Sequence, residues 1–315
     1  MVPYIGNGFY CYANATAMLL AASGEDVPAS RIEVLCGVGL GATWMPAANM
    51  IFFGNLASLP DVGVSRALDL LGFGFTERAS EATTPPPFAA LRADLAHSPA
   101  VLGPLDMGFL RYNPSHADLG GEDHYVLAYD MDDREIYLHD PLGFPHVSLM
   151  LADLEHAWKA ERISYRRGSY RYWTALQRRA RPTEEQLYAR AIQSFKAAYR
   201  TSEQIAAHQP WARDWTIDSE AILKCADQVR SGHLAPNLKA HLTYFALQLG
   251  TKRALDFASF FAPRSPALAQ LKHTQAQLFG KGHTLAVREE WASLAGTLQR
   301  LADVEEEFRT TLLKQ

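Results

Sequence analysis

One of the three cysteines, Cys11, stands where a thiol could act as a nucleophile. It follows the glycine-rich, aromatic segment GNGFY and begins a run of small and apolar residues at helical spacing. The backbone N–H groups of a first helical turn stabilise a thiolate, and they can donate to the oxyanion that forms when sulfur attacks a carbonyl. A lone cysteine in an apolar helix is otherwise a packing residue, so chemistry at Cys11 requires partners elsewhere in the chain.

His124 and Asp140 are the candidate partners. The alternating runs HYVLAYD and EIYLHDP are joined by the tight acidic turn MDDR, which predicts a β-hairpin that begins at His124 and ends at Asp140. If the loop holds three residues centred on Asp132, the two positions lie directly opposite each other on one face of the sheet. The carboxylate would then fix the imidazole tautomer, so that the other ring nitrogen can take the thiol proton. The alternative is a strand-end histidine with an ordinary surface aspartate.

The helix that must carry Cys11 is expected to be central and buried. From Tyr12 to Ala22 small and apolar residues recur on more than one side, and Gly24 ends the run. Two further helices are expected within 64–72 and in TTPPPFAALRADLAHS, and strands are expected in PAVLGPLDM, in the hairpin and near SYRYWTAL. The glycine-rich stretch LCGVGLGATWMP is expected to be a loop, and its GVGLG follows a helix, which argues against a dinucleotide fingerprint.

The pattern changes beyond Pro182. TEEQLYARAIQSFKAAYR opens with a capping signature, and every later apolar run has helical periodicity, which predicts a bundle of about five helices. The sequence therefore predicts an α+β protein with two domains. Residues 1–180 would form a central buried helix packed on an antiparallel sheet, and residues 181–315 an all-helical domain.

Composition excludes several classes of protein. The formal charge of −4 gives no overall attraction to nucleic acid or anionic membranes, and no apolar run approaches the length of a membrane span. The amino terminus lacks the basic flank of a signal peptide. The cysteines lack Cys-x-x-Cys spacing and the histidines lack metal-ligand spacing, so we expect neither disulfides nor a metal, and a cytoplasmic location.

These motifs together resemble the papain-like cysteine peptidase clan. The shared features are Cys11 ahead of alternating alanines, His124 in HYVL, and Asp140 in YLHDP. Within the clan the chain is similar to the double-glycine leader peptidases of bacteriocin exporters and, more closely, to the butirosin-biosynthesis H-type (BtrH-like) acyltransferases. Those acyltransferases also join a papain-like domain to a helical domain, and they carry a segment similar to LCGVGLGATW. The resemblance thus covers essentially the whole chain.

The resemblance implies a thioester intermediate on Cys11, with His124 as base and then acid and Asp140 orienting the imidazole. Papain-like enzymes place a glutamine six residues before the nucleophile as an oxyanion donor, whereas Ile5 occupies that position here. Asn7 is the substitute donor, with the Cys11 backbone N–H as the second. The alternative for Asn7 is a simple turn residue between two glycines.

The implied reaction moves an acyl group from an acyl carrier protein thioester to a small-molecule amine, forming an amide in antibiotic or other specialised metabolism. No cofactor is expected, because phosphopantetheine arrives as part of the donor. A basic stretch could steer the acidic carrier protein. The alternative for this stretch is a solvated strand and linker. The candidate docking residues are Arg162, Arg166, Arg167 and Arg171.

Two other functions remain open from the sequence. A cysteine peptidase or amidase shares the first half-reaction and differs only in what accepts the acyl group. A catalytically silent papain-like module whose helical part recruits a partner would need none of this chemistry. The chain shows no fused membrane segment or nucleotide-binding domain of the kind that leader peptidases carry, which argues against the leader-peptidase interpretation.

Overall fold

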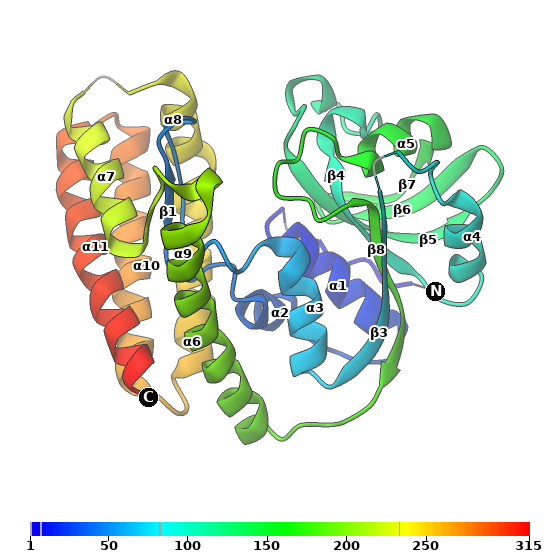
Figure 1. Cartoon of the computed structure of the whole chain (residues 1–315), viewed down its shortest axis with the longest axis horizontal. Coiled ribbons are helices and arrows are strands. Elements are labelled where there is room, and N and C mark those ends of the chain that lie inside the picture. Colours follow the sequence, from blue (N-terminus) through cyan, green and yellow to red (C-terminus); the bar gives the residue numbers. More distant parts are fainter. Residues whose placement is uncertain (1, 7, 82, 233) are drawn as a thin grey trace. The chain divides into compact units, whose positions relative to one another are not determined.

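The computed structural model describes residues 2–6, 8–81, 83–232 and 234–315, and the chain divides into two compact units (Figure 1). The first unit contains the residues up to Cys36 and Pro60–Thr183, and the second contains Gly37–Leu59 and Glu184–Gln315. The predicted combination of helices, an antiparallel sheet and a mainly helical carboxyl-terminal part is confirmed. The domain boundaries differ from the prediction of 1–180 and 181–315, because residues 37–59 belong to the second unit.

The first unit is built on a six-stranded sheet with every neighbouring pair antiparallel, in the order β3-β8-β4-β5-β6-β7. The strands are β3 (Phe73–Ser80), β4 (Ala100–Asp106), β5 (Asp123–Met131), β6 (Glu135–Asp140), β7 (Phe144–Met150) and β8 (Ser169–Arg178). The helices are α1 (Cys11–Ala22), α2 (Ala29–Cys36), α3 (Pro60–Leu70), α4 (Phe88–Leu95) and α5 (Leu151–Lys159), with short 3-10 turns at Met107–Phe109 and His116–Asp118.

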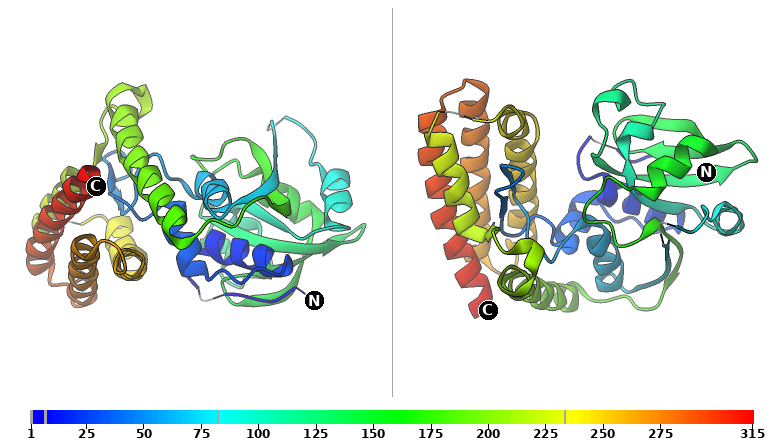
Figure 2. Two further views of the ribbon diagram at one scale, coloured as in Figure 1. Left: turned by 90° about the horizontal axis from the view of Figure 1, so that it is seen from below. Right: turned by 45° about the horizontal axis from the view of Figure 1, so that its top comes forward.

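Helix α1 is buried as predicted and packs on β4 and β5. Its residues from Tyr12 to Leu20 are all buried, and the alanines among them let the helix approach the sheet closely. Tyr12 contacts Tyr125 edge to face, whereas the next residue of β5, Val126, packs into a core shared with α5. Because neighbouring strand residues point to opposite faces, α1 and α5 cover opposite faces of the sheet. Figure 2 shows α1 in front of the sheet when seen from below.

The second unit is mainly helical but contains a small antiparallel sheet, so the prediction of an all-helical domain was wrong in this respect. Its sheet has the order β2-β1-β9. The strands are β1 (Thr43–Met45), β2 (Met50–Phe52) and β9 (Thr216–Ile217). The helices are α6 (Glu184–His208), α7 (Asp218–Arg230), α8 (Pro236–His241), α9 (Leu247–Phe261), α10 (Pro266–Val287) and α11 (Trp291–Lys314), with a 3-10 turn at Pro210–Ala212 and a π-helical turn at Leu242–Ala246.

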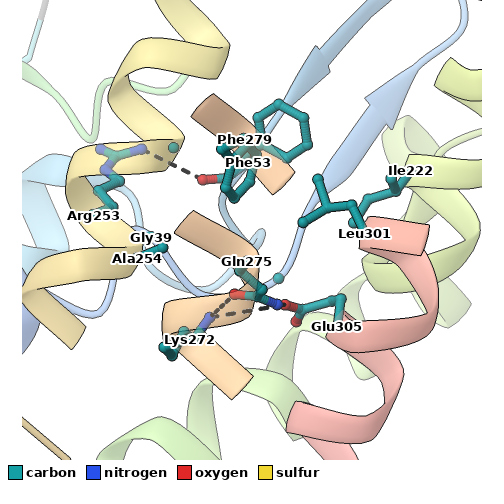
Figure 3. Close-up of a pocket in the computed structure, with 12 residues that line it drawn as sticks. Gly39, Phe53, Ile222, Arg253, Ala254, Lys272, Gln275, Phe279, Leu301 and Glu305 are labelled. Atoms are coloured by element: carbon teal, nitrogen blue, oxygen red, sulfur yellow. Dashed lines mark hydrogen bonds and ion pairs between the residues drawn. The ribbon is translucent and has the colours of Figure 1, made fainter. Parts of the chain in front are cut away.

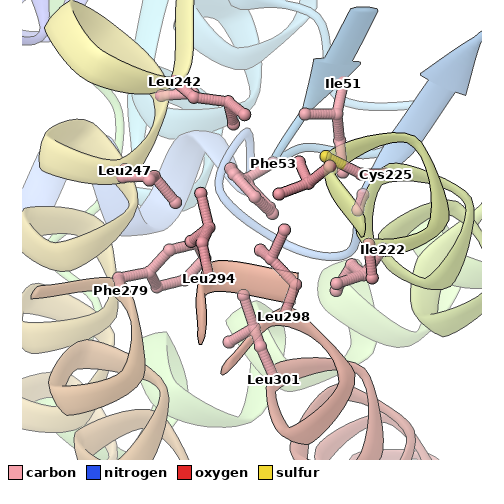
Figure 4. Packing of buried hydrophobic residues seen from close by; sticks show 14 of the residues in the cluster. Ile51, Phe53, Ile222, Cys225, Leu242, Leu247, Phe279, Leu294, Leu298 and Leu301 are labelled. Carbon is pink, nitrogen blue, oxygen red and sulfur yellow. The ribbon is translucent and has the colours of Figure 1, made fainter. Parts of the chain in front are cut away.

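Apolar side chains explain why residues 37–59 join the helices. Ile51 and Phe53 lie among Ile222, Phe279 and Leu298, which come from α7, α10 and α11 (Figure 4). Ile51 is fully buried and Phe53 contacts Phe279 edge to face. Burying a side chain of this size stabilises the fold by about 1.5–3 kcal/mol, so the segment contributes to the core of the second unit.

Gly41 explains part of the glycine-rich stretch and gives a prediction. Its φ is +71°, and a Cβ atom there would lie 2.4 Å from Oδ1 of Asp218. We expect Gly41→Ala to lower the free energy of unfolding by more than the roughly 1–2 kcal/mol that a left-handed backbone alone costs a non-glycine residue. Chemical denaturation of the variant measures the loss.

Gly232 supplies the matched control for this substitution. Its φ is +72°, but no atom lies within 4 Å of the position of an added Cβ. Gly232→Ala should therefore show the backbone cost alone. Equal losses in the two variants would contradict the role assigned to the contact with Asp218.

Candidate active site

Cys11 is the first residue of α1, as the sequence predicted. The preceding residue, Tyr10, has a left-handed backbone (φ 57°, ψ 50°) that turns the chain into the helix, and no side chain caps this end. The first helical hydrogen bond runs from the N–H of Asn14 to the carbonyl of Tyr10 at 2.8 Å. The N–H of Cys11 lies before this bond and therefore belongs to the first turn, whose N–H groups are not bonded within the helix. Cys11 is half-buried, whereas Cys36 and Cys225 are fully buried. Among the cysteines, Cys11 alone is therefore within reach of a substrate.

The structure brings Cys11, His124 and Asp140 together. His124 lies at the start of β5 and is 4% exposed, and Asp140 ends β6 and is fully buried. Nε2 of His124 donates to Oδ1 of Asp140 at 2.7 Å, and the imidazole lies close enough to Cys11 for the two groups to interact electrostatically. Because Nε2 is occupied by the carboxylate, Nδ1 is the nitrogen available to the sulfur. The arrangement links a thiol, a base and an orienting carboxylate in one row.

The hairpin register differs from the predicted one. Leu127 lies opposite His139. In this register Asp140 faces position 126, whereas the predicted register placed it opposite His124. The turn is tighter than expected, with the N–H of Asp132 donating to the carbonyl of Glu135 at 2.9 Å, and β5 contains a one-residue bulge. The observed register thus differs from the predicted one by two positions, and the side chains of a strand alternate between the two faces of the sheet with a period of two residues. His124 and Asp140 therefore stay on one face and meet along the diagonal.

Asp140 is held by several donors besides His124. Oδ1 also accepts from the N–H of Leu142 at 2.7 Å, and Oδ2 accepts from the hydroxyl of Tyr112 at 2.9 Å. Burial raises the pKa of Asp140, but the charge and hydrogen bond of His124, with those of the other donors, bring this pKa below its usual value. The carboxyl group is therefore ionised around neutral pH and can stabilise a charged imidazole.

The environment of His124 favours its protonated form. Burial lowers its pKa, but the charge and hydrogen bond of Asp140 and the interactions with Cys11 outweigh burial and raise this pKa to about 10. An imidazolium beside a thiol stabilises the thiolate, which is the nucleophilic form of cysteine. The same imidazolium can protonate a departing group.

The raised pKa of His124 predicts how stability depends on pH. From a value near 6.5 in the unfolded chain, the pKa rises to about 10 in the folded protein. The stabilisation is therefore complete below about pH 6.5 and is lost as the pH rises toward 10. We expect a loss of roughly 2–4 kcal/mol in the free energy of unfolding across this range, since one pKa unit corresponds to about 1.4 kcal/mol.

Asp140→Asn isolates the contribution of the pair, because it keeps an acceptor for His124 but removes the charge. Urea unfolding at several pH values should show that the free energy of unfolding declines less steeply with rising pH in this variant than in the wild type. Parallel curves would contradict the assignment, because other groups that titrate in this range, such as Asp218 with a pKa of about 8, are common to both proteins.

The other candidate residues have different outcomes. Asn7, the predicted oxyanion donor, lies outside the described residues, and the backbone N–H of Cys11, the second predicted donor, stays a prediction. Tyr112 was not identified from the sequence. The polar segment that carries it, RYNPSHADLGGED, precedes His124 in the sequence, and no pattern within it distinguishes this tyrosine from a packing residue.

The arginines predicted to dock a carrier protein are largely engaged within their own unit. Three of the four pair with carboxylates from distant parts of the chain, as a strand and linker, the alternative interpretation, would also do. The ion pairs are Arg162 with Asp106, Arg167 with Asp61 and Arg171 with Glu77, and Arg166 donates to the carbonyls of Glu161 and Ile163. Docking of a carrier protein at these arginines stays a prediction.

The second unit contains a small cavity (Figure 3). Its volume is about 10 Å³, space for a single water. Beside it, Glu305 accepts from Tyr199 at 2.6 Å and from Gln275 at 2.7 Å, and Lys272 donates to Gln275 at 2.8 Å. These polar groups hydrogen-bond one another and link α6, α10 and α11. The cluster therefore stabilises the helices rather than offering a site for an organic molecule.

In the part of the chain that the structure describes, no group of three or more histidine, cysteine, aspartate or glutamate side chains could hold a metal ion. No helix among the same residues has both the length and the apolar character needed to cross a membrane.

Comparison with known proteins places the chain in a family. It is 41% identical over 314 residues to the uncharacterized protein YobF of Bacillus subtilis (strain 168), and the match covers 100% of this chain and 99% of that protein. A family model described as the YobF C-terminal domain matches residues 212–313, which span α7 to α11 of the second unit. The chain therefore belongs to the YobF family.

Proposed function

We propose that this protein is an enzyme that transfers acyl groups through a thioester on Cys11. The observation that carries the proposal is the position of His124, whose imidazole hydrogen-bonds the buried Asp140 carboxylate and interacts with Cys11. A thiol at a helix start, a base and an orienting carboxylate are the groups that nucleophilic cysteine catalysis requires. The same positions support a papain-like arrangement of the first unit.

In the first half-reaction the Cys11 thiolate attacks the carbonyl carbon of an acyl thioester. The backbone N–H of Cys11 is placed to donate to the developing oxyanion. The carbon–sulfur bond of the donor breaks, and the departing thiolate takes the proton from the His124 imidazolium. The products are an acyl-enzyme, a free thiol and a neutral imidazole.

In the second half-reaction an amine attacks the acyl-enzyme. His124 takes a proton from the amine, the bond between the acyl carbon and the Cys11 sulfur breaks, and the products are an amide and the original thiolate–imidazolium pair. A carrier-protein donor and an amine acceptor are favoured by the resemblance to acyltransferases of antibiotic biosynthesis. Water as the acceptor would make the protein a peptidase or amidase.

Mass measurement of the intact protein tests the proposal. The protein is mixed with a panel of acyl-pantetheine thioesters, and the mass of the chain and of its Cys11 peptide is recorded. We expect a mass increase equal to one acyl group on that peptide, removed when a primary amine is added and recovered as the amide.

The alternatives give different results. Cleavage of peptide substrates with no reaction toward thioesters would make the protein a peptidase. A silent binding module would show no adduct from any donor, and its Cys11 would react with iodoacetamide as slowly as a free thiol.

A further inference from the structure

We propose that Tyr112 is a positioning residue of this site, fixing the carboxylate of Asp140 and, through it, the imidazole of His124. The inference rests on the proposed function, because it assigns a residue to the same thiol–imidazole–carboxylate row. It extends that row by one member that lies on a different segment of the chain.

The hydrogen bonds around Asp140 leave its carboxylate no freedom to rotate without losing a partner. Oδ2 accepts from the Tyr112 hydroxyl at 2.9 Å, while Oδ1 accepts from Nε2 of His124 and from the N–H of Leu142, each at 2.7 Å. Without Tyr112, Oδ2 would be a buried acceptor with no side-chain donor among the described residues, and the carboxylate could turn about its own bond. The position of the imidazole relative to the sulfur would then be less well fixed.

The ring of Tyr112 is held as well as its hydroxyl. It is half-buried, and it meets Phe144 edge to face with the ring centroids 5.8 Å apart. Phe144 begins β7 and pairs with Asp140 across the sheet. The aromatic contact and the hydrogen bond therefore orient Tyr112 toward the same corner of the sheet.

The loop that carries Tyr112, residues 107–122, is anchored at both ends by Asp106. Oδ1 of Asp106, a residue 1% exposed, accepts from the N–H groups of Gly108 at 3.0 Å and Gly121 at 2.9 Å. Arg162 completes the anchor with two hydrogen bonds to the same carboxylate, at 2.5 and 2.9 Å. A bidentate arginine–carboxylate pair of this kind fixes geometry as well as charge. The hydroxyl of Tyr112 is therefore presented by a loop that is already ordered.

The inference has a consequence for pH dependence. Among the described residues, three titratable side chains face Asp140: His124 from β5, Tyr112 from the loop, and Tyr4, whose hydroxyl donates to the Asp140 carbonyl at 3.1 Å. The hydrogen bond from the Tyr112 hydroxyl is one of the interactions that lower the pKa of Asp140. Removing it raises the pKa of Asp140, so the carboxylate is protonated at a higher pH and the acidic limb of the reaction should move to higher pH.

The test compares Tyr112→Phe with a matched tyrosine. Tyr137 lies on β6, and its hydroxyl donates to Oδ2 of Asp132 at 2.7 Å, the same type of bond at the exposed end of the hairpin. The rate of acyl loading from an acyl-pantetheine thioester, measured across pH, is the readout. We expect Tyr112→Phe to lower the rate about tenfold, since the lost bond is to a charged acceptor, and Tyr137→Phe to match the wild type.

A double-mutant cycle separates positioning from a general structural role. If Tyr112 acts through Asp140, then Tyr112→Phe added to Asp140→Ala should produce little further loss. A full tenfold loss in that background would overturn the inference, as would a Tyr112→Phe variant with the wild-type rate and pH profile. Failure of the proposed function itself would look different, because the wild-type protein would then form no acyl adduct on Cys11.

Discussion

Replacing Cys11 by alanine will abolish acyl loading and lower any turnover by at least about a thousandfold, because no other group can form the covalent intermediate. The other thiols cannot substitute. Cys36 and Cys225 are both 0% exposed, and burial raises the pKa of the Cys225 thiol to about 12. Intact-mass analysis with an acyl-pantetheine donor, with an assay of amide formation alongside, measures both effects.

Cys225→Ala is the control for this prediction, since it also removes one thiol but lies in the core of the second unit. We expect acyl loading to persist in this variant, even if the loss of a packed side chain lowers its thermal stability. Loading that survives in Cys11→Ala, or that disappears in Cys225→Ala while the protein stays folded, would rule out Cys11 as the nucleophile.

His124→Ala should have the second largest effect, a fall in the acyl-loading rate of roughly a thousandfold. The substitution removes the group that holds the proton between sulfur and leaving group, and it leaves the Asp140 carboxylate buried without its charged partner. Alkylation of Cys11 by iodoacetamide should also become slower at mildly acidic pH, because the imidazolium that favours the nucleophilic form of the thiol is gone.

His146→Ala is the matched histidine substitution. His146 lies on β7, is exposed, and hydrogen-bonds Tyr129 at 3.1 Å. Its replacement should leave acyl loading unchanged. Comparable losses in the two variants would mean that the rate depends on the integrity of the sheet and not on the imidazole of His124.

The elements that carry the site could be predicted because their signals are local. A helix apolar on several sides must be buried, and two alternating runs around MDDR must form a hairpin, whatever the rest of the chain does. The register was missed by two positions because the turn and the bulge in β5 depend on packing against neighbouring strands. An error of one position would have separated His124 from Asp140, whereas an error of two preserved their common face.

Long-range partners account for what could not be predicted. Trp44, Ile51 and Phe53 become core residues only because α7, α10 and α11 surround them, and those helices lie far away in sequence. The charge of the arginine-rich stretch suggested a free surface, but the carboxylates that neutralise it come from other segments. Tyr112 shows the same limit, since its importance depends on a hydrogen bond to a residue 28 positions away.

The pH dependence of Cys11 alkylation tests most directly whether sulfur and imidazole act together. Iodoacetamide is added at a series of pH values, and the rate at Cys11 is followed by peptide mass. At mildly acidic pH we expect a much higher rate in the wild type than in His124→Ala, because an imidazolium beside a thiol favours its nucleophilic form. The same rate in the two proteins at every pH would show that Cys11 reacts without the help of His124.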